Sequence, residues 1–326
     1  MKCDHDGNIY VAYSGTSLPP DSGALPVRKI PADSTGRVIE YTLQNLPDYQ
    51  SAEQLNYDVN PWGTVYYLLR AYRHWPRLKG EQPDLVAAKF KDDGTLDSVT
   101  KLESTGEGYL QANLFAVFPY GGFLVTGTLV EDPAQHLARP FTGIYDRTGR
   151  FVREVELTGD VTAGSGAKDV GENGPAKQDA SAAKDVDWML AVSEGNMIGA
   201  PDGNVYLLRA SNPPRLYAIS AGGEVVKALT LRFDAAGLTP IGMSLAGENQ
   251  ALIEFGHYPT GKPSEDSKYH TVLSLVNLAS GDVTGTFEAP EDVLPSACAT
   301  SNDEFLFLGT SKQGTLDVVK FADSAN

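Results

Sequence analysis

A short turn-and-strand unit recurs along the chain and constrains its fold more than any other feature. Residues 6–11 (Asp-Gly-Asn-Ile-Tyr-Val) return as residues 202–207 (Asp-Gly-Asn-Val-Tyr-Leu). The Asp-Gly and Gly-Asn steps are typical of a tight turn with positive φ, and the β-branched and aromatic run that follows is typical of a strand. Weaker copies begin at Trp62, Gly121, Glu248 and Asn302, so the unit occurs six times.

A second signature, a hairpin with glycine in its turn, follows five of these copies. It is clearest at 90–96, 145–151 and 219–225, with further examples at 34–39 and 276–283. The two signatures together predict modules of four antiparallel strands. Six such modules give about 54 residues each, which suits the blade of a β-propeller. We therefore predict one all-β domain over 1–326, a six-bladed β-propeller with approximate blades at 1–50, 56–105, 112–160, 192–233, 240–290 and 296–326.

The last predicted blade lacks its closing strand. Its third strand covers 314–321, and only five residues follow. Propellers commonly take the missing strand from the N-terminus, which leaves no sheet edge open. Because Met1 leads directly into the first blade, we expect the native chain to extend upstream. No signal peptide is visible, so the chain as written predicts a cytoplasmic protein, and a longer N-terminus would allow a periplasmic or secreted one.

The charge balance argues against two classes of partner. Lys and Arg total 26 and Asp and Glu total 42, which gives a net charge of −16. This charge repels nucleic-acid backbones and anionic membrane surfaces. No apolar run approaches the ~18 residues of a membrane helix, so we predict no membrane span and no nucleic-acid partner.

The two cysteines, Cys3 and Cys298, occupy equivalent positions of the first and last blades. Each stands seven residues before the aromatic anchor of its unit. A disulfide needs Cα atoms within about 7 Å, and inner strands of adjacent blades are often farther apart. The sequence thus favours two buried thiols. The alternative, a bridge, would fasten the ring and indicate an oxidising compartment.

These units resemble those of six-bladed propellers of the NHL-like and gluconolactonase-like kind. The resemblance rests on the two Asp-Gly-Asn copies and the five glycine-centred hairpins, and it covers most of the chain. It implies a fold that hosts hydrolases, scaffolds and receptors alike. In the gluconolactonase-like members, Glu, Asn and Asp side chains hold a divalent cation in the central channel. The residues here that match this chemistry on different blades are Asp4, Asp58, Asn60, Asn113, Glu194, Asn196 and Glu248.

Other chemistry is weakly represented. Residues 4–8 (Asp-His-Asp-Gly-Asn) echo the start of a calcium loop, but turn chemistry explains them without a metal. No nucleophile elbow is present, and the five histidines form no recognisable pattern, so we predict surface or loop histidines. An aromatic cluster near residues 62–75 is explained mostly by blade packing. Trp62, Tyr72 and Trp75 are the candidates within it for stacking on a sugar or a peptide.

Three long connections, near 14–33, 160–190 and 256–269, are expected to be surface excursions or lids over one mouth of the channel. With no catalytic motif in view, we predict a non-catalytic propeller that binds an unknown protein or small-molecule ligand. The alternative is a lactonase- or esterase-type hydrolase that depends on calcium or another divalent cation in the channel.

Overall fold

The computed structural model describes the residues 1–12, 24–32, 36–105, 108–132, 137–157, 195–211, 213–232, 238–247, 249–256, 271–288, 293–299, 304–310 and 316–322. Their regular structure is entirely β, with no helix among them, and it is divided among six antiparallel sheets.

The first three sheets each have four strands in sequence order. They are β1 (Lys2–Cys3), β2 (Ile9–Ala12), β3 (Val27–Ile30) and β4 (Ile39–Tyr41); β5 (Ser51–Val59), β6 (Val65–Tyr72), β7 (Asp84–Phe90) and β8 (Leu96–Lys101); and β9 (Tyr109–Val117), β10 (Phe123–Asp132), β11 (Leu137–Tyr145) and β12 (Phe151–Glu154).

The last three sheets follow the same order, and the sixth has three strands. They are β13 (Gly195–Gly199), β14 (Val205–Arg209), β15 (Arg215–Ile219) and β16 (Val225–Thr230); β17 (Thr239–Ala246), β18 (Gln250–Gly256), β19 (Thr271–Asn277) and β20 (Val283–Glu288); and β21 (Val293–Ala299), β22 (Glu304–Thr310) and β23 (Leu316–Ala322).

One five-residue turn joins most of the described hairpins. It links the first and second strands at 4–8, 60–64, 118–122 and 200–204, and the third and fourth at 91–95, 146–150 and 220–224. In the first of these, Gly7 N–H donates to Asp4 O at 3.1 Å and Asp4 N–H donates to Asn8 O at 3.2 Å. The fourth residue is a glycine with positive φ in every copy, 78° at Gly7. A type I turn followed by a left-handed residue requires this conformation, so both repeated signatures are confirmed as turns.

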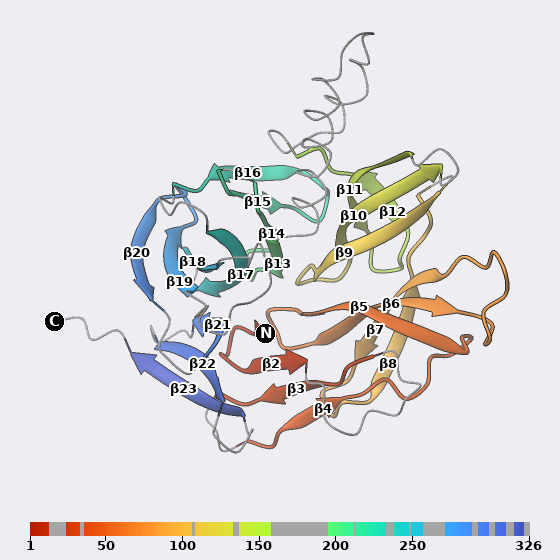
Figure 1. Cartoon of the computed structure of the whole chain (residues 1–326), viewed down its shortest axis with the longest axis horizontal. Coiled ribbons are helices and arrows are strands. Elements are labelled where there is room, and N and C mark those ends of the chain that lie inside the picture. The colour runs from red at the N-terminus through yellow and green to blue at the C-terminus, as the bar shows by residue number, and fades with distance from the viewer. Residues whose placement is uncertain are drawn as a thin grey trace, which may run out of the picture.

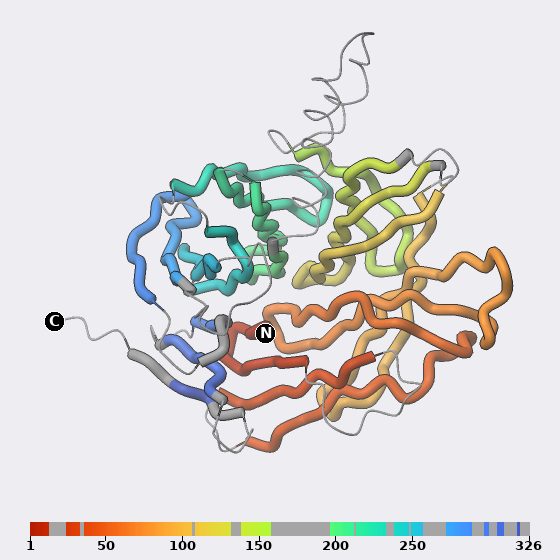
Figure 2. The backbone as a smooth tube through the Cα atoms, in the orientation of Figure 1, coloured from red at the N-terminus to blue at the C-terminus, as the bar shows by residue number. Residues whose placement is uncertain are grey.

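The first strands of the six sheets stand around one axis. They contact one another in the order β1, β5, β9, β13, β17, β21, and β21 contacts β1 again. Figure 1 shows the sheets arranged as blades around this centre, and Figure 2 shows the N-terminus lying there. The fold is a six-bladed β-propeller. Its last blade has three strands, as predicted from the sequence.

The core is divided into six clusters of buried residues, one between each pair of neighbouring blades. Alternation along β6 shows how a strand serves two of them. Tyr67 and Leu69 pack against the first blade, and Leu68 packs against the third. All three side chains are fully buried. Each contributes about 1.5–3 kcal/mol through burial, so an inner strand of a blade needs apolar residues on both faces.

Cys3 and Cys298 form a disulfide, so the expectation of two free thiols is wrong. Their Cα atoms are 5.9 Å apart. The first strands of blades one and six converge at this end of the ring, which brings the two residues inside the ~7 Å limit for a bridge. Cys298 is fully buried beside Ile9 and Leu306. The bond therefore joins the first blade covalently to the last.

The predicted insertions lie mainly outside the described residues. The ranges 14–23, 160–190 and 257–269 belong wholly to that undescribed part. Residues 27–30 of the first predicted insertion form β3 and pair with β2 and β4. Among the described residues, no helix is long and apolar enough to span a membrane.

Candidate ligand-binding site at the mouth of the ring

A cavity of about 550 Å³ opens at one mouth of the ring, where the first strands end. Its floor is apolar and includes the Cys3 end of the disulfide together with Ile198, Leu245 and Ala299. These residues come from blades one, four, five and six. The cavity therefore exists only when the ring is closed, and its volume lies in the range of sites for small organic ligands.

The polar residues of the cavity come from three turns and from strand β16. His5 comes from blade one, Asp202 and Lys227 from blade four, and Asn249 from blade five. Lys227 Nζ donates to Leu278 O at 2.6 Å, so its ammonium is held at the wall with donor capacity left over. The site thus offers a carboxylate, an ammonium, an amide and an imidazole above an apolar floor.

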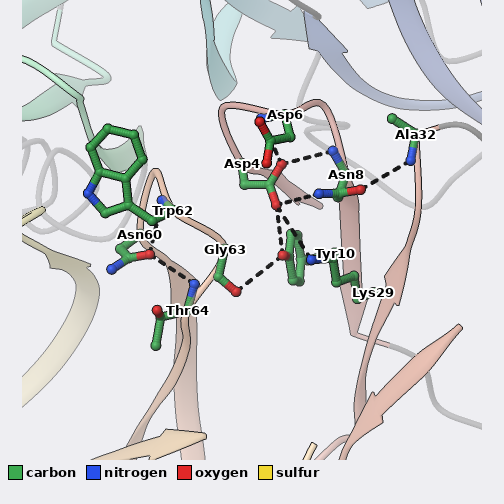
Figure 3. A network of polar contacts seen from close by, with 10 residues as sticks. All are labelled: Asp4, Asp6, Asn8, Tyr10, Lys29, Ala32, Asn60, Trp62, Gly63 and Thr64. Atoms are coloured by element: carbon green, nitrogen blue, oxygen red, sulfur yellow. Dashed lines mark hydrogen bonds and ion pairs between the residues drawn. The ribbon is translucent and has the colours of Figure 1, made fainter. Parts of the chain in front are cut away.

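The turn that carries His5 is fixed by the carboxylate of Asp4, as Figure 3 shows. Asp4 Oδ1 accepts the backbone N–H groups of Asp6 at 3.1 Å and Asn8 at 2.9 Å. Its Oδ2 accepts from Asn8 Nδ2 and from the Tyr10 hydroxyl, both at 2.8 Å. Asp4 is buried, and these donors use the oxygens that a calcium loop would offer to the metal. The contacts are those expected of a turn.

Burial, with the neighbouring charge of Asp4, raises the pKa of Tyr10 far above its usual value. The hydroxyl is therefore protonated at neutral pH and donates to Asp4. Tyr206 and Asp202 repeat the arrangement in blade four, where the hydroxyl donates to Asp202 Oδ2 at 3.0 Å. Burial again raises the pKa of Tyr206, with the Asp202 carboxylate adding to the shift.

Blades one and two approach each other closely beside the cavity. His5 N–H donates to Pro61 O at 2.9 Å. A Cβ atom on Gly63 would lie 2.8 Å from the Tyr10 hydroxyl and 2.9 Å from Asp4 Oδ2, and the φ of Gly63 is +84°. Glycine is required there for both reasons. The wall that carries His5 is consequently packed tightly against blade two.

Lys2 reaches across the channel below the cavity. Its Nζ lies 3.2 Å from Asp58 Oδ1 in blade two and 3.1 Å from Asn196 Oδ1 in blade four. Asp58 is fully buried, and its Oδ2 accepts from Val117 N–H at 2.8 Å. Burial raises the pKa of Asp58, while the Lys2 ammonium opposes that shift. A tethered cation therefore lies between two residues that the sequence proposes as metal ligands.

The other proposed metal ligands are spread over several environments. Asn60 Oδ1 accepts the backbone N–H groups of Trp62 and Thr64, at 3.1 and 2.9 Å. Asn113 is half-buried on β9, and Glu194 and Glu248 lie outside the described residues. Within the described part of the chain, no three His, Cys, Asp or Glu side chains are grouped to hold a metal ion. The carboxylates of Asp4 and Asp58 already accept hydrogen bonds from protein groups, so we derive no metal-dependent step. Metal binding by the seven candidates stays a prediction.

The three proposed stacking residues lie at opposite ends of β6. Trp62 is exposed next to the cavity, with its ring edge-to-face with His5 at 6.2 Å between centroids. Tyr72 is buried at the far end of the strand and is covered by the Arg77 guanidinium, 3.8 Å from the ring centroid. Trp75 is exposed just beyond it. An eight-residue strand is about 26 Å long, so these residues do not form one binding surface.

Sequence reasoning missed most of the cavity. It assigned His5 to a surface or loop, which agrees with its exposure, but gave no role to Asp202, Lys227 or Asn249. The one signal available was the repeat itself. The turns that follow first strands meet at one mouth of a propeller, so their exposed residues are brought together there.

A scan against protein-family models and a search of curated proteins found no match for this chain. Solved structures with a similar fold were found. A protein from Bacteroides caccae is 13% identical over 93% of this chain and 88% of its own, with a TM-score of 0.45. A protein from Dyadobacter fermentans is 9% identical over 94% and 85%, with a TM-score of 0.46. A Hadza microbial sialidase is 10% identical over 94% of this chain and 61% of its own, with a TM-score of 0.50. Of these three, the sialidase reaches a TM-score of 0.50, and at 10% identity its likeness shows the fold alone.

Proposed function

We propose that the protein is a non-catalytic binding propeller that takes a small organic ligand into the mouth cavity. The observation that carries the proposal is the cavity itself, about 550 Å³ with an apolar floor and polar groups from three blades above it. An apolar body would rest on Ile198, Leu245 and Ala299. Hydrogen-bonding groups of the ligand would meet His5, Asp202 and Asn249. Sites of this composition are typical of small-molecule recognition.

The rigidity of the walls supports binding by a preformed site. The Asp4 network, the His5–Pro61 hydrogen bond and the disulfide fix the elements that surround the cavity. A site that is ordered before the ligand arrives loses little conformational entropy on binding. The resemblance of the turn sequences to NHL-like and gluconolactonase-like propellers is compatible with a site at this end of the channel.

The proposal is tested by thermal unfolding against a panel of sugars, nucleosides, amino acids and organic acids. A compound present at a hundredfold excess over its Kd stabilises the native state by about 2.7 kcal/mol. Ala279→Trp places a large side chain in the cavity wall and is expected to abolish the shift. Val226→Trp, on the exposed outer strand of blade four, is the matched control and should preserve it.

Two results would contradict the proposal. One is a panel in which no compound stabilises the wild-type protein, and the other is a compound that stabilises the Ala279→Trp variant equally well. A parallel series after EDTA, with calcium, magnesium, manganese or zinc added back, tests the cation-dependent hydrolase. An ion-specific rise in midpoint would support that alternative.

A further inference from the structure

The loop between β6 and β7 differs in charge from the rest of the molecule. Residues 73–82 carry three cations, Arg73, Arg77 and Lys79, and one carboxylate, Glu81, in a chain whose net charge is −16. Every residue from 73 to 80 is exposed. Figure 1 shows this connection, in orange, reaching outward from the ring. It lies at the opposite end of β6 from the mouth cavity, so it is a separate surface.

The loop is held in one conformation by side chains around its base. Glu81 Oε1 accepts Arg73 N–H at 2.9 Å, and its Oε2 accepts Leu78 N–H at 3.2 Å. Gln50 Oε1 accepts Trp75 N–H at 2.8 Å. These bonds present the Trp75 side chain to solvent with 62% of its surface exposed. A pre-ordered aromatic residue loses less entropy on binding than a mobile one.

Two cations of the loop are available to a ligand. Arg73 is paired with Asp84 at 3.0 Å. In the part of the chain that the structure describes, no carboxylate forms an ion pair with Arg77 or Lys79. The Arg77 guanidinium lies over the Tyr72 ring, 3.8 Å from its centroid, a contact that does not neutralise its charge. The loop therefore combines an exposed indole with two uncompensated positive charges.

We propose that this loop binds an extended acidic polysaccharide. The CH face of a sugar ring would stack on the indole of Trp75, and the carboxylate or sulfate groups along the polymer would meet Arg77 and Lys79. A standard protein interface uses about 20–30 residues on each side, more than this loop offers by itself. An extended polysaccharide can bind through one or two sugar units, a contact that an exposed indole and two cations of the same loop can provide.

The experiment is affinity electrophoresis of the full chain through gels that contain one polymer each. Polygalacturonate offers carboxylates on sugar rings and dextran sulfate offers sulfates, so the pair distinguishes the two acidic groups. Dextran offers rings without charge, and poly-glutamate offers charge without rings. We expect retardation by at least one of the acidic polysaccharides and none by dextran. Binding to poly-glutamate should be about tenfold weaker.

Three variants locate the interaction. Trp75→Ala should weaken binding about tenfold, since the stacking contact is lost. Arg77→Gln with Lys79→Gln should weaken it about fivefold at low salt and remove most of its salt dependence. Trp62→Ala is the matched control, because that indole is 56% exposed on the other face of the ring, and it should change nothing. All four positions are exposed, so thermal midpoints should stay close to that of the wild type.

Several outcomes would overturn the proposal. They are no retardation by either acidic polysaccharide, equal binding of poly-glutamate, retention in dextran, or equal losses in the Trp62→Ala and Trp75→Ala variants. None of these depends on the mouth cavity, so failure of this inference is distinct from failure of the proposed function.

Discussion

Breaking the Cys3–Cys298 disulfide is expected to destabilise the closed ring. The bond joins residues 295 positions apart and connects the first strand of blade one to that of blade six. Apart from the cysteines, the buried residues described between these blades are Ile9, Leu306 and Leu308, and partly buried hydrophobic residues such as Val11 and Val318 pack against them. Cys3→Ser removes the bond and leaves the fully buried Cys298 thiol in place, so packing at that interface is nearly preserved.

The expected loss follows from the length of the loop that the bond closes. In the chain-entropy treatment, a loop of 295 residues corresponds to roughly 5–6 kcal/mol of stabilisation. Measured disulfides usually deliver less, because the unfolded chain retains structure, so we expect a loss of about 3–5 kcal/mol. For a urea m-value of about 3 kcal/mol/M, the unfolding midpoint should fall by about 1–1.7 M.

Urea unfolding followed by tryptophan fluorescence measures this loss in four samples. These are the wild type and the Cys3→Ser variant, each with and without reductant. Reductant should lower the midpoint of the wild type to that of the variant and leave the variant unchanged. The reasoning would be refuted by equal midpoints in all four samples. If two thiols titrate in the unfolded, unreduced wild type, the disulfide itself is absent and the reasoning fails.

Three further perturbations test the polar contacts. Asp4→Ala removes the carboxylate that accepts hydrogen bonds from the buried Tyr10 hydroxyl and from the turn, so urea unfolding should show a loss of about 1–3 kcal/mol in the free energy of unfolding. Asp202→Ala, in an exposed turn, should cost under about 1 kcal/mol. Equal losses in the two variants would contradict this reasoning. Asp58→Ala leaves the Lys2 ammonium buried without its carboxylate and should lower the free energy of unfolding by about 3–5 kcal/mol. Adding Lys2→Met to this variant should restore part of the lost stability. An absence of recovery in the double variant would count against the ion pair. Asp84 is partly buried, which would raise its pKa, but hydrogen bonds from Lys101, Arg73 and Tyr49 lower it below its usual value. The stability that the ionised Asp84 contributes is therefore present above its unfolded-state pKa and is lost as pH falls through its folded-state pKa. In the wild type, the thermal midpoint should fall below about pH 4, and Asp84→Asn should make this fall less steep. An unchanged slope in the variant would exclude this role.

The repeat could be predicted from the sequence because its cause is local. Gly7 and Gly203 adopt positive φ in turns set by neighbouring residues, and those turns recur at blade spacing. The distance between Cys3 and Cys298 could not be predicted in this way, because its cause is not local. It depends on how closely blades one and six meet, and packing around the whole ring decides that.

In the candidate site, too, the sequence predicts local features but not which distant residues meet. His5 and Asp202 lie almost 200 residues apart and line one cavity only because the ring closes. Asp58 and Asn196 are polar residues on separate blades, which suggested a metal site, and the structure places the Lys2 ammonium between them. Trp62 and Trp75 are close in sequence, yet the length of β6 separates them to opposite ends of a blade.

The most direct test of the central claim is a crystal structure of the protein with the compound that stabilises it most. Our account predicts the compound in the mouth cavity, with its apolar part on Ile198 and Leu245 and hydrogen bonds to His5 or Asp202. A compound seated elsewhere on the propeller, with the cavity filled only by solvent, would contradict it.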